Sequence, residues 1–132
     1  MNDLARWLGE QLDEDERIAR GATDGPWTPW RGARLHGLGD LIHPVLTPGQ
    51  KPGAKAAIVT ESWLDADHIA EWDPARVLRE IDAKRDLLRF AEGIYDHHET
   101  FTTGVAARLE KTLRLFALPY ADHPEYRDDW RP

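Results

Sequence analysis

The chain lacks cysteine altogether, has a single methionine and contains no long apolar run. The absence of cysteine excludes disulfides, thiolate metal sites and cysteine nucleophiles, so stability must come from packing. No window approaches the roughly 18 consecutive apolar residues that a membrane-spanning helix requires. The N-terminal stretch is acidic where a signal peptide would be apolar. We therefore expect a cytoplasmic protein without membrane contact.

The composition fits one soluble globular domain that covers residues 1–132. With 41% hydrophobic residues, 31% charged residues and six tryptophans, the chain has enough apolar material for a core and too much for a disordered protein. A length of 132 residues leaves little room for a second domain. The net charge of −7 repels phosphate over most of the surface, which disfavours a nucleic-acid partner.

Residues 3–20 are predicted to form the first helix, because apolar residues recur there with helical spacing. Trp7 and Ile18 lie at the edge of this stripe, and Asp15 lies inside it. Asp15 is either at the rim of the buried face or a partnered, partly buried carboxylate, and we favour the rim. The stripe itself consists of Leu4, Leu8, Leu12, Ala19 and Ala22.

Residues 26–61 are rich in proline and glycine and are predicted to form a small antiparallel sheet. Two β-prone runs, 41–46 and 56–60, flank a segment dense in turn residues and predict a hairpin. Residues 27–30 are a candidate third strand. Pro44 confines its own strand to an edge or a bulge. The open edge is available for pairing with another chain, but we favour a sheet that covers one side of the helices.

Two helices are predicted after the sheet, over residues 63–72 and 74–95. Ser62 caps the first of them with Asp65 three residues on, and Asp73-Pro74 ends it and begins the next. The shorter helix places Leu64, His68 and Trp72 on one side. We interpret His68 as a core histidine that is hydrogen-bonded to Asp65 or to the backbone.

The helix over 74–95 carries two apolar stripes and therefore needs cover on two sides. Its five basic and five acidic side chains between residues 73 and 92 sum to a neutral, solvated face rather than a nucleic-acid footprint. Either the domain wraps the second stripe or a partner covers it, and we favour a two-fold homodimer. The first stripe is Val77, Ile81, Leu88, Ala91 and Tyr95. The second is Ala83, Leu87, Phe90 and Ile94, of which Leu87, Phe90 and Ile94 are the candidate partner-binding residues.

A fourth helix is predicted over residues 104–118, followed by a docked tail over 119–132. Pro119 ends this helix, and the tail holds Tyr120, Tyr126 and Trp130, whose rings we expect to pack on the body of the domain. The apolar stripe of the fourth helix consists of Val105, Ala106, Leu109, Leu113, Phe116 and Ala117.

A cluster of potential metal ligands lies between the last two helices, at Asp96, His97, His98 and Glu99. His123 or His68 would have to complete a site there. Adjacent histidines point apart, whereas zinc requires three or four convergent ligands. We therefore interpret the cluster as surface residues at a turn. The sequence assigns no catalytic residue, no cofactor-binding residue and no cofactor, and the spacing of its many carboxylates selects no catalytic pair.

Four segments together carry a resemblance that spans most of the chain: residues 12–20, the Gly-Pro-Trp corner at 25–27, the His-Ile-Ala-x-x-Asp-Pro-Ala-Arg-Val-Leu helix from residue 68, and the closing segment from 113, which contains Leu-Pro-Tyr-Ala-Asp-His-Pro. The chain resembles a family of small uncharacterised proteins from actinobacteria and their phages. Its plan is also similar to small prophage accessory proteins. That resemblance implies a biological setting and no reaction.

These observations predict an α+β fold with about four helices and a small antiparallel sheet inserted after the first helix. The predicted function is that of a non-enzymatic protein-interaction or regulatory accessory protein, a phage- or prophage-associated modulator of a host factor whose partner the sequence does not identify. The alternative is a small metal-binding protein or hydrolase that uses Asp96, His97, His98 and Glu99.

Overall fold

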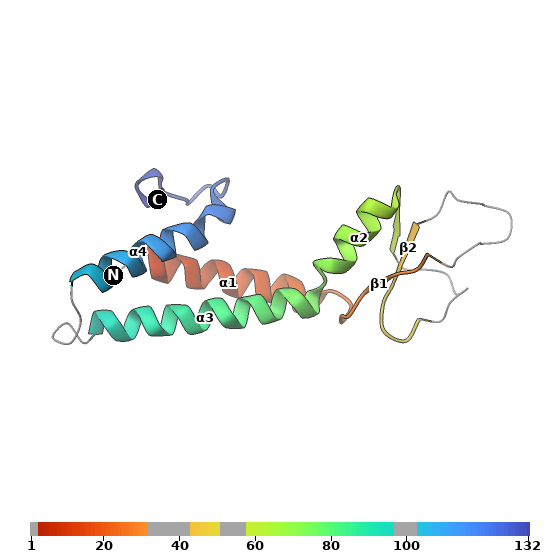
Figure 1. Ribbon diagram of the computed structural model, residues 1–132, viewed down its shortest axis with the longest axis horizontal. Helices are drawn as coiled ribbons and strands as arrows, with labels where there is room; N and C mark the ends of the chain where they lie inside the picture. The colour runs from red at the N-terminus through yellow and green to blue at the C-terminus, as the bar shows by residue number, and fades with distance from the viewer. Residues whose placement is uncertain (1–2, 32–42, 51–57, 97–102) are drawn as a thin grey trace, which may run out of the picture. The chain divides into compact units, whose positions relative to one another are not determined.

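The computed structural model describes residues 3–31, 43–50, 58–96 and 103–132. Their helices and strands confirm the predicted α+β class, with four α-helices and a three-stranded antiparallel sheet that follows the first helix (Figure 1). The chain divides into two compact units. The helical unit comprises Met1–Asp15 with Ile81–Pro132, and the sheet unit comprises Glu16–Glu80. The expectation of a single domain stays a prediction.

The helical unit contains the first part of helix α1 (Asp3–Gly21), the second part of α3 (Pro74–Asp96) and all of α4 (Thr103–Ala117). The periodic apolar residues that predicted these helices supply the core of the unit. Trp7, expected at the edge of its stripe, is only 6% exposed. The most deeply buried side chains are Leu8 and Leu12 of α1, Ile81 and Ala91 of α3, and Leu113 and Ala117 of α4.

The C-terminal tail packs against the helical unit, as its aromatic residues predicted. It forms two short 3₁₀ helices, η2 (Leu118–Tyr120) and η3 (Asp128–Trp130). The Trp130 side chain is 7% exposed. The Arg114 guanidinium of α4 donates hydrogen bonds to the backbone carbonyl oxygens of Asp129, at 2.7 Å, and Arg131, at 3.2 Å. Apolar burial and these charged donors together fix the tail on α4.

The sheet unit contains strands β1 (Thr28–Pro29), β2 (His43–Leu46) and β3 (Ile58–Thr60) in the order β1-β2-β3. Helix α2 (Trp63–Glu71) packs on one face of this sheet. The antiparallel pairing of β2 with β3 and the third strand are as predicted, and residues 41–42 and 56–57 of the predicted runs lie outside the described residues. The small core consists of Val45, Ala66 and Ala70, with Trp27, Ile58, Trp63 and Ile69 packed around it.

The position of β2 in the sheet corrects the expectation for Pro44, because β2 is the central strand and not an edge. Pro44 pairs with Val59 on the β3 side, and its carbonyl oxygen accepts from the Trp30 amide at 3.0 Å on the β1 side. The N–H and C=O of one residue point to the same side of a strand. The missing proline N–H therefore faces the short strand β1, where it forfeits one bond at the end of a two-residue pairing.

Asp73 organises the start of α3 by binding two segments of the sheet unit. One carboxylate oxygen accepts from the Arg76 amide at 2.9 Å and caps the helix, as predicted, while the other accepts from the Trp27 amide at 2.8 Å. The residue is 6% exposed. A Cβ at Gly25 would lie 2.8 Å from the Ala75 Cβ, so only glycine fits where the corner before Trp27 meets α3.

Two further expectations about single residues, those for His68 and Val77, differ from the structure. His68 is exposed, so its interpretation as a core histidine is wrong. Leu64, on the same side of α2, is 81% exposed, because α2 turns its alanines toward the sheet. Val77 is half-buried where burial was expected.

The Ser62 cap is confirmed by the 3.1 Å hydrogen bond from the Asp65 amide to Ser62 Oγ. No described helix is both long and apolar enough to cross a membrane.

Candidate functional site

Among the described side chains of helix α3, the first predicted apolar stripe is largely buried and the second is exposed at Ala83 and Phe90. In the first stripe Ile81 is 2% exposed and Leu88 is 7% exposed. In the second, Leu87 is half-buried, whereas Phe90 is 57% exposed. Ile94 belongs to α3, but its side chain falls outside the described residues. The alternative that the domain itself wraps this stripe is therefore wrong for Phe90, and we call Leu87 and Phe90 the exposed face of α3.

The basic residues of α3 are largely engaged with acidic neighbours. Arg85 pairs with Asp13 at 2.7 Å, and Arg89 pairs with Asp86. Arg76 contacts two glutamates, Glu71 at 2.6 Å and Glu80 at 3.2 Å, and stacks 3.9 Å from the Trp72 ring centre. These pairs form an alternating charged surface of the kind that the sequence predicts.

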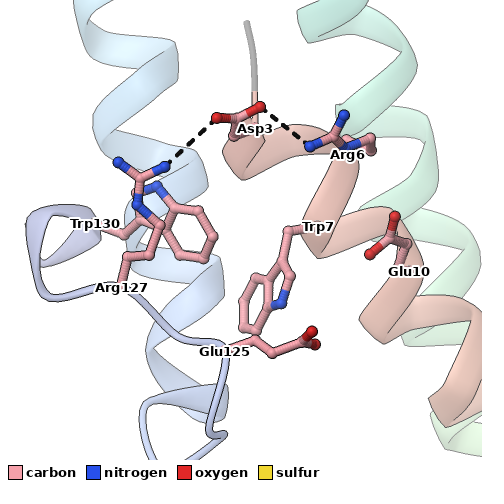
Figure 2. Close-up of a pocket in the computed structure, with 7 residues that line it drawn as sticks. All are labelled: Asp3, Arg6, Trp7, Glu10, Glu125, Arg127 and Trp130. Carbon is pink, nitrogen blue, oxygen red and sulfur yellow. Dashed lines mark hydrogen bonds and ion pairs between the residues drawn. The ribbon is translucent and has the colours of Figure 1, made fainter.

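A cleft lies between the first turns of α1 and the tail within the helical unit, and the two segments that form it are separated by more than a hundred residues (Figure 2). Its volume is about 420 Å³, within the range of small-ligand sites. On one side Asp3 accepts from Arg6 at 3.2 Å and from Arg127 at 3.5 Å. The lining residues are Asp3, Arg6, Trp7, Glu10, Glu125, Arg127 and Trp130.

Trp7 is the centre of an aromatic cluster beside this cleft. Its ring centre lies 5.0 Å from that of Trp130 and between 5.6 and 6.0 Å from those of Tyr120, His123 and Tyr126. The contacts with Tyr120, His123 and Tyr126 are edge-to-face, and such contacts add to the stabilisation from burial alone. The cluster explains why the tail docks on the body of the unit.

Two buried polar atoms of this cluster have no hydrogen-bond partner: the indole nitrogen of Trp7 and the hydroxyl of Tyr126. An indole N–H can only donate, so the Trp7 nitrogen requires an acceptor. Buried donors without partners are uncommon in native proteins and call for an explanation, such as a bound water or ligand. The cleft is therefore the candidate binding site of the described part of the chain.

Asp15 is a partnered, half-buried carboxylate, which corrects the preference for a rim position. Its carboxylate accepts a hydrogen bond from the hydroxyl of Tyr120 in the tail. Burial, and then the hydrogen bond to Asp15, raise the pKa of the Tyr120 phenol above its ordinary value. Asp15 was conspicuous in sequence as an acid inside an apolar stripe, but no local pattern connected it to residue 120.

The structure brings no metal site together among the residues that it describes. In those residues, no three side chains of the ligating types His, Asp and Glu lie close enough to hold an ion. His123 instead belongs to the aromatic cluster, where its Nδ1 accepts from the Glu125 amide at 3.1 Å. The predicted candidates His97, His98 and Glu99 lie outside the described residues, as does the side chain of Asp96.

Comparison with known proteins places the whole chain in one family. The profile of a family of unknown function (DUF6221) matches residues 1–132, and the chain belongs to that family. No curated protein and no solved structure matches the chain.

Proposed function

We propose that this member of the DUF6221 family acts through protein–protein contact, and that the exposed face of α3 is its contact surface. The observation that carries the proposal is Phe90, a large aromatic side chain that is 57% exposed one helical turn from Leu87. Aromatic residues that enter a partner's pocket dominate the binding energy of many interfaces. The predicted stripe continues to Ile94 at helical spacing, which would lengthen the surface by one turn.

A second copy of the chain is the partner that we propose for this face. A contact of α3 with its own copy is two-fold symmetric, so Leu87 of one copy packs against Phe90 of the other and the reverse. The protein as a whole carries a net charge of −7, which opposes self-association. The repulsion is weak at the proposed contact itself, because the five basic side chains between residues 73 and 92 balance the five acidic ones there.

Light scattering after gel filtration at micromolar concentration tests the proposal. We expect wild type to elute with about twice the chain mass of 15.1 kDa. Phe90→Asp is expected to be folded and monomeric, because a carboxylate at the centre of the contact would be buried without a partner. Leu64→Asp is the matched control, since Leu64 is 81% exposed on the sheet unit and should leave the dimer intact. A monomeric wild type contradicts the proposal.

The biological setting that we propose is a cytoplasmic, non-enzymatic accessory role, associated with a phage or prophage, in which the contact regulates a host factor. It is supported by the resemblance of four sequence segments and by the membership of a family without an assigned activity. Affinity purification of wild type and Phe90→Asp from an actinobacterial lysate tests it. A stoichiometric host protein that only wild type retains is the expected result if the dimer is the form that binds it, and equal retention by both chains would show that dimerisation through α3 is not needed for regulation.

A further inference from the structure

The cleft beside Trp7 contains a buried hydrogen-bond donor without a partner, the Trp7 indole N–H, and two acidic side chains, Glu10 and Glu125. Trp7 is 6% exposed, and its indole nitrogen has no acceptor. In Figure 2 this nitrogen lies on the side of the ring that faces Glu10 and Glu125. Glu10 follows Trp7 by three residues on α1, so it borders the same face of the helix. The donor therefore points toward the acidic side of the cleft.

The two ends of the cleft differ in charge balance. At one end the cations are engaged, because Arg6 and Arg127 both contact Asp3 and Arg127 also pairs with Asp129 at 2.6 Å. At the other end Glu10 and Glu125 are exposed. Within the described part of the chain, neither carboxylate has an ion-pair or hydrogen-bond partner. The uncompensated charge of the cleft is thus negative and is concentrated beside the Trp7 nitrogen.

We propose that this cleft is a binding site for an organic ammonium group, held between the carboxylates of Glu10 and Glu125 with its alkyl chain against Trp7 and Trp130. An ammonium between two carboxylates is attracted to both of them. Each carboxylate has about four lone-pair sites. One oxygen can therefore bind the ammonium while another accepts from the Trp7 indole, which satisfies the buried donor.

An alkylammonium fits this site better than a metal ion does. Divalent metals require several oxygen ligands around one point, whereas two unpaired carboxylates border this cleft among the described residues, and no group of three potential metal ligands is found there. A volume of about 420 Å³ also exceeds the needs of a single ion and accommodates a short alkyl chain. The indole rings of Trp7 and Trp130 line the cleft and offer the alkyl chain an apolar surface. The same group occurs on free amines and on the lysine side chains of proteins.

Nuclear magnetic resonance of the indole N–H groups tests the site in the full-length chain. Trp7→Phe identifies the Trp7 resonance among the six tryptophans. We expect butylammonium to shift this resonance saturably and to move it downfield as the N–H gains an acceptor. Butan-1-ol, the neutral analogue, and Ca²⁺ are expected to leave it unchanged. Because exposed charges are screened by salt, the shift at a fixed butylammonium concentration should decrease as NaCl is added.

Charge-neutral variants connect the shift to the two carboxylates. Replacing both, as Glu10→Gln with Glu125→Gln, should weaken butylammonium binding about tenfold or more, as expected for two lost ion pairs. Asp82→Asn with Glu92→Gln on α3 is the matched control, because it removes the same two charges at exposed positions outside the cleft and should bind as wild type does. An unmoved Trp7 resonance, an equal response to butan-1-ol, or full binding by the double variant would overturn the proposal.

The source of the ammonium is resolved by comparing butane-1,4-diamine with a blocked lysine peptide, acetyl-Gly-Lys-Gly-amide. Tighter binding of the diamine indicates a free amine ligand, and tighter binding of the peptide indicates a lysine of a partner protein. Both results support an ammonium site, whereas binding of neither overturns it. The contact surface proposed on α3 is tested independently, because Phe90→Asp leaves every residue of the cleft in place.

Discussion

Replacing Asp73 by alanine removes two hydrogen-bond acceptors from the sheet unit at once. The carboxylate caps α3 through the Arg76 amide and binds the Trp27 amide on the opposite oxygen. Loss of an aspartate cap costs about 1 kcal/mol. Loss of a partly buried bond to a charged acceptor costs about 1.5–3 kcal/mol, because the Trp27 amide is left without a partner. We expect Asp73→Ala to lower the free energy of unfolding by about 2.5–4 kcal/mol.

Two further variants, ranked by their loss of unfolding free energy, separate the effect of the local hydrogen bonds from the effect of removing a charge. Asp73→Asn keeps one acceptor oxygen and should cost less than alanine, about 1–2 kcal/mol. Asp82→Asn, at an exposed position on the same helix, removes an equal charge and should change stability by less than about 0.5 kcal/mol. Urea titration followed by circular dichroism measures all three, and amide hydrogen exchange at Trp27 reports the lost bond directly. An Asp73→Ala cost below about 0.5 kcal/mol would refute the account of this contact.

Four further outcomes follow from the packing and the titratable groups. Leu88→Ala should cost about 2–5 kcal/mol in urea titrations, since Leu88 is 7% exposed in the core, and a loss below about 0.5 kcal/mol would show that it lies outside the core. Gly25→Ala should destabilise by about 1–3 kcal/mol, because the new Cβ meets α3 at 2.8 Å; wild-type stability would argue against that close approach. The pKa of Tyr120 is raised from 10.0, so the folded state holds this proton more tightly. Its contribution is complete below about pH 10 and is lost as pH rises above it. Thermal melts from pH 8 to 11 should therefore decline less steeply for Tyr120→Phe, and an identical decline would contradict the assignment. Replacing His97 and His98 together by alanine should change neither folding nor zinc content, and stoichiometric zinc that only wild type binds would establish a metal site.

Local patterns predicted the helices of this protein well. Asp73-Pro74 marks the start of α3, and Ser62 with Asp65 marks the start of α2, because capping depends on residues within one turn. The docking of the tail was also predictable, because burial of its three aromatic rings against the domain is energetically favourable. The α+β class followed from these elements and from the proline- and glycine-rich segment between them.

Errors arose where distant segments decide the environment of a residue. Leu64, His68 and Trp72 share one side of α2, but the small residues Ala66 and Ala70 on the other side allow the closer approach to the sheet. Pro44 tolerates a central strand only because β1 is two residues long. Neither fact is contained in the periodicity of the segment itself.

The candidate cleft could not be predicted, because residues 3–10 and 125–130 meet only through tertiary packing. One signal was present in the sequence. Trp7 lies at the edge of an apolar stripe, and a ring of this size at such a position can extend past its own helix and contact a second segment of the chain. The exposed face of α3, by contrast, was predicted from the two stripes alone. Its occupant was left open, since a stripe specifies a buried surface and not the chain that covers it.

Electron spin resonance of a single nitroxide on α3 tests the proposed contact most directly. The chain has no cysteine, so Asp86→Cys provides a unique labelling site beside Leu87 at an exposed position. Helices that pack at about 8–10 Å place two such labels about 15–30 Å apart in a two-fold dimer. We predict a dipolar distance in that range for the labelled chain and its loss when Phe90→Asp is added. No dipolar coupling, or a distance beyond about 40 Å that persists with Phe90→Asp, would contradict a dimer formed through this face.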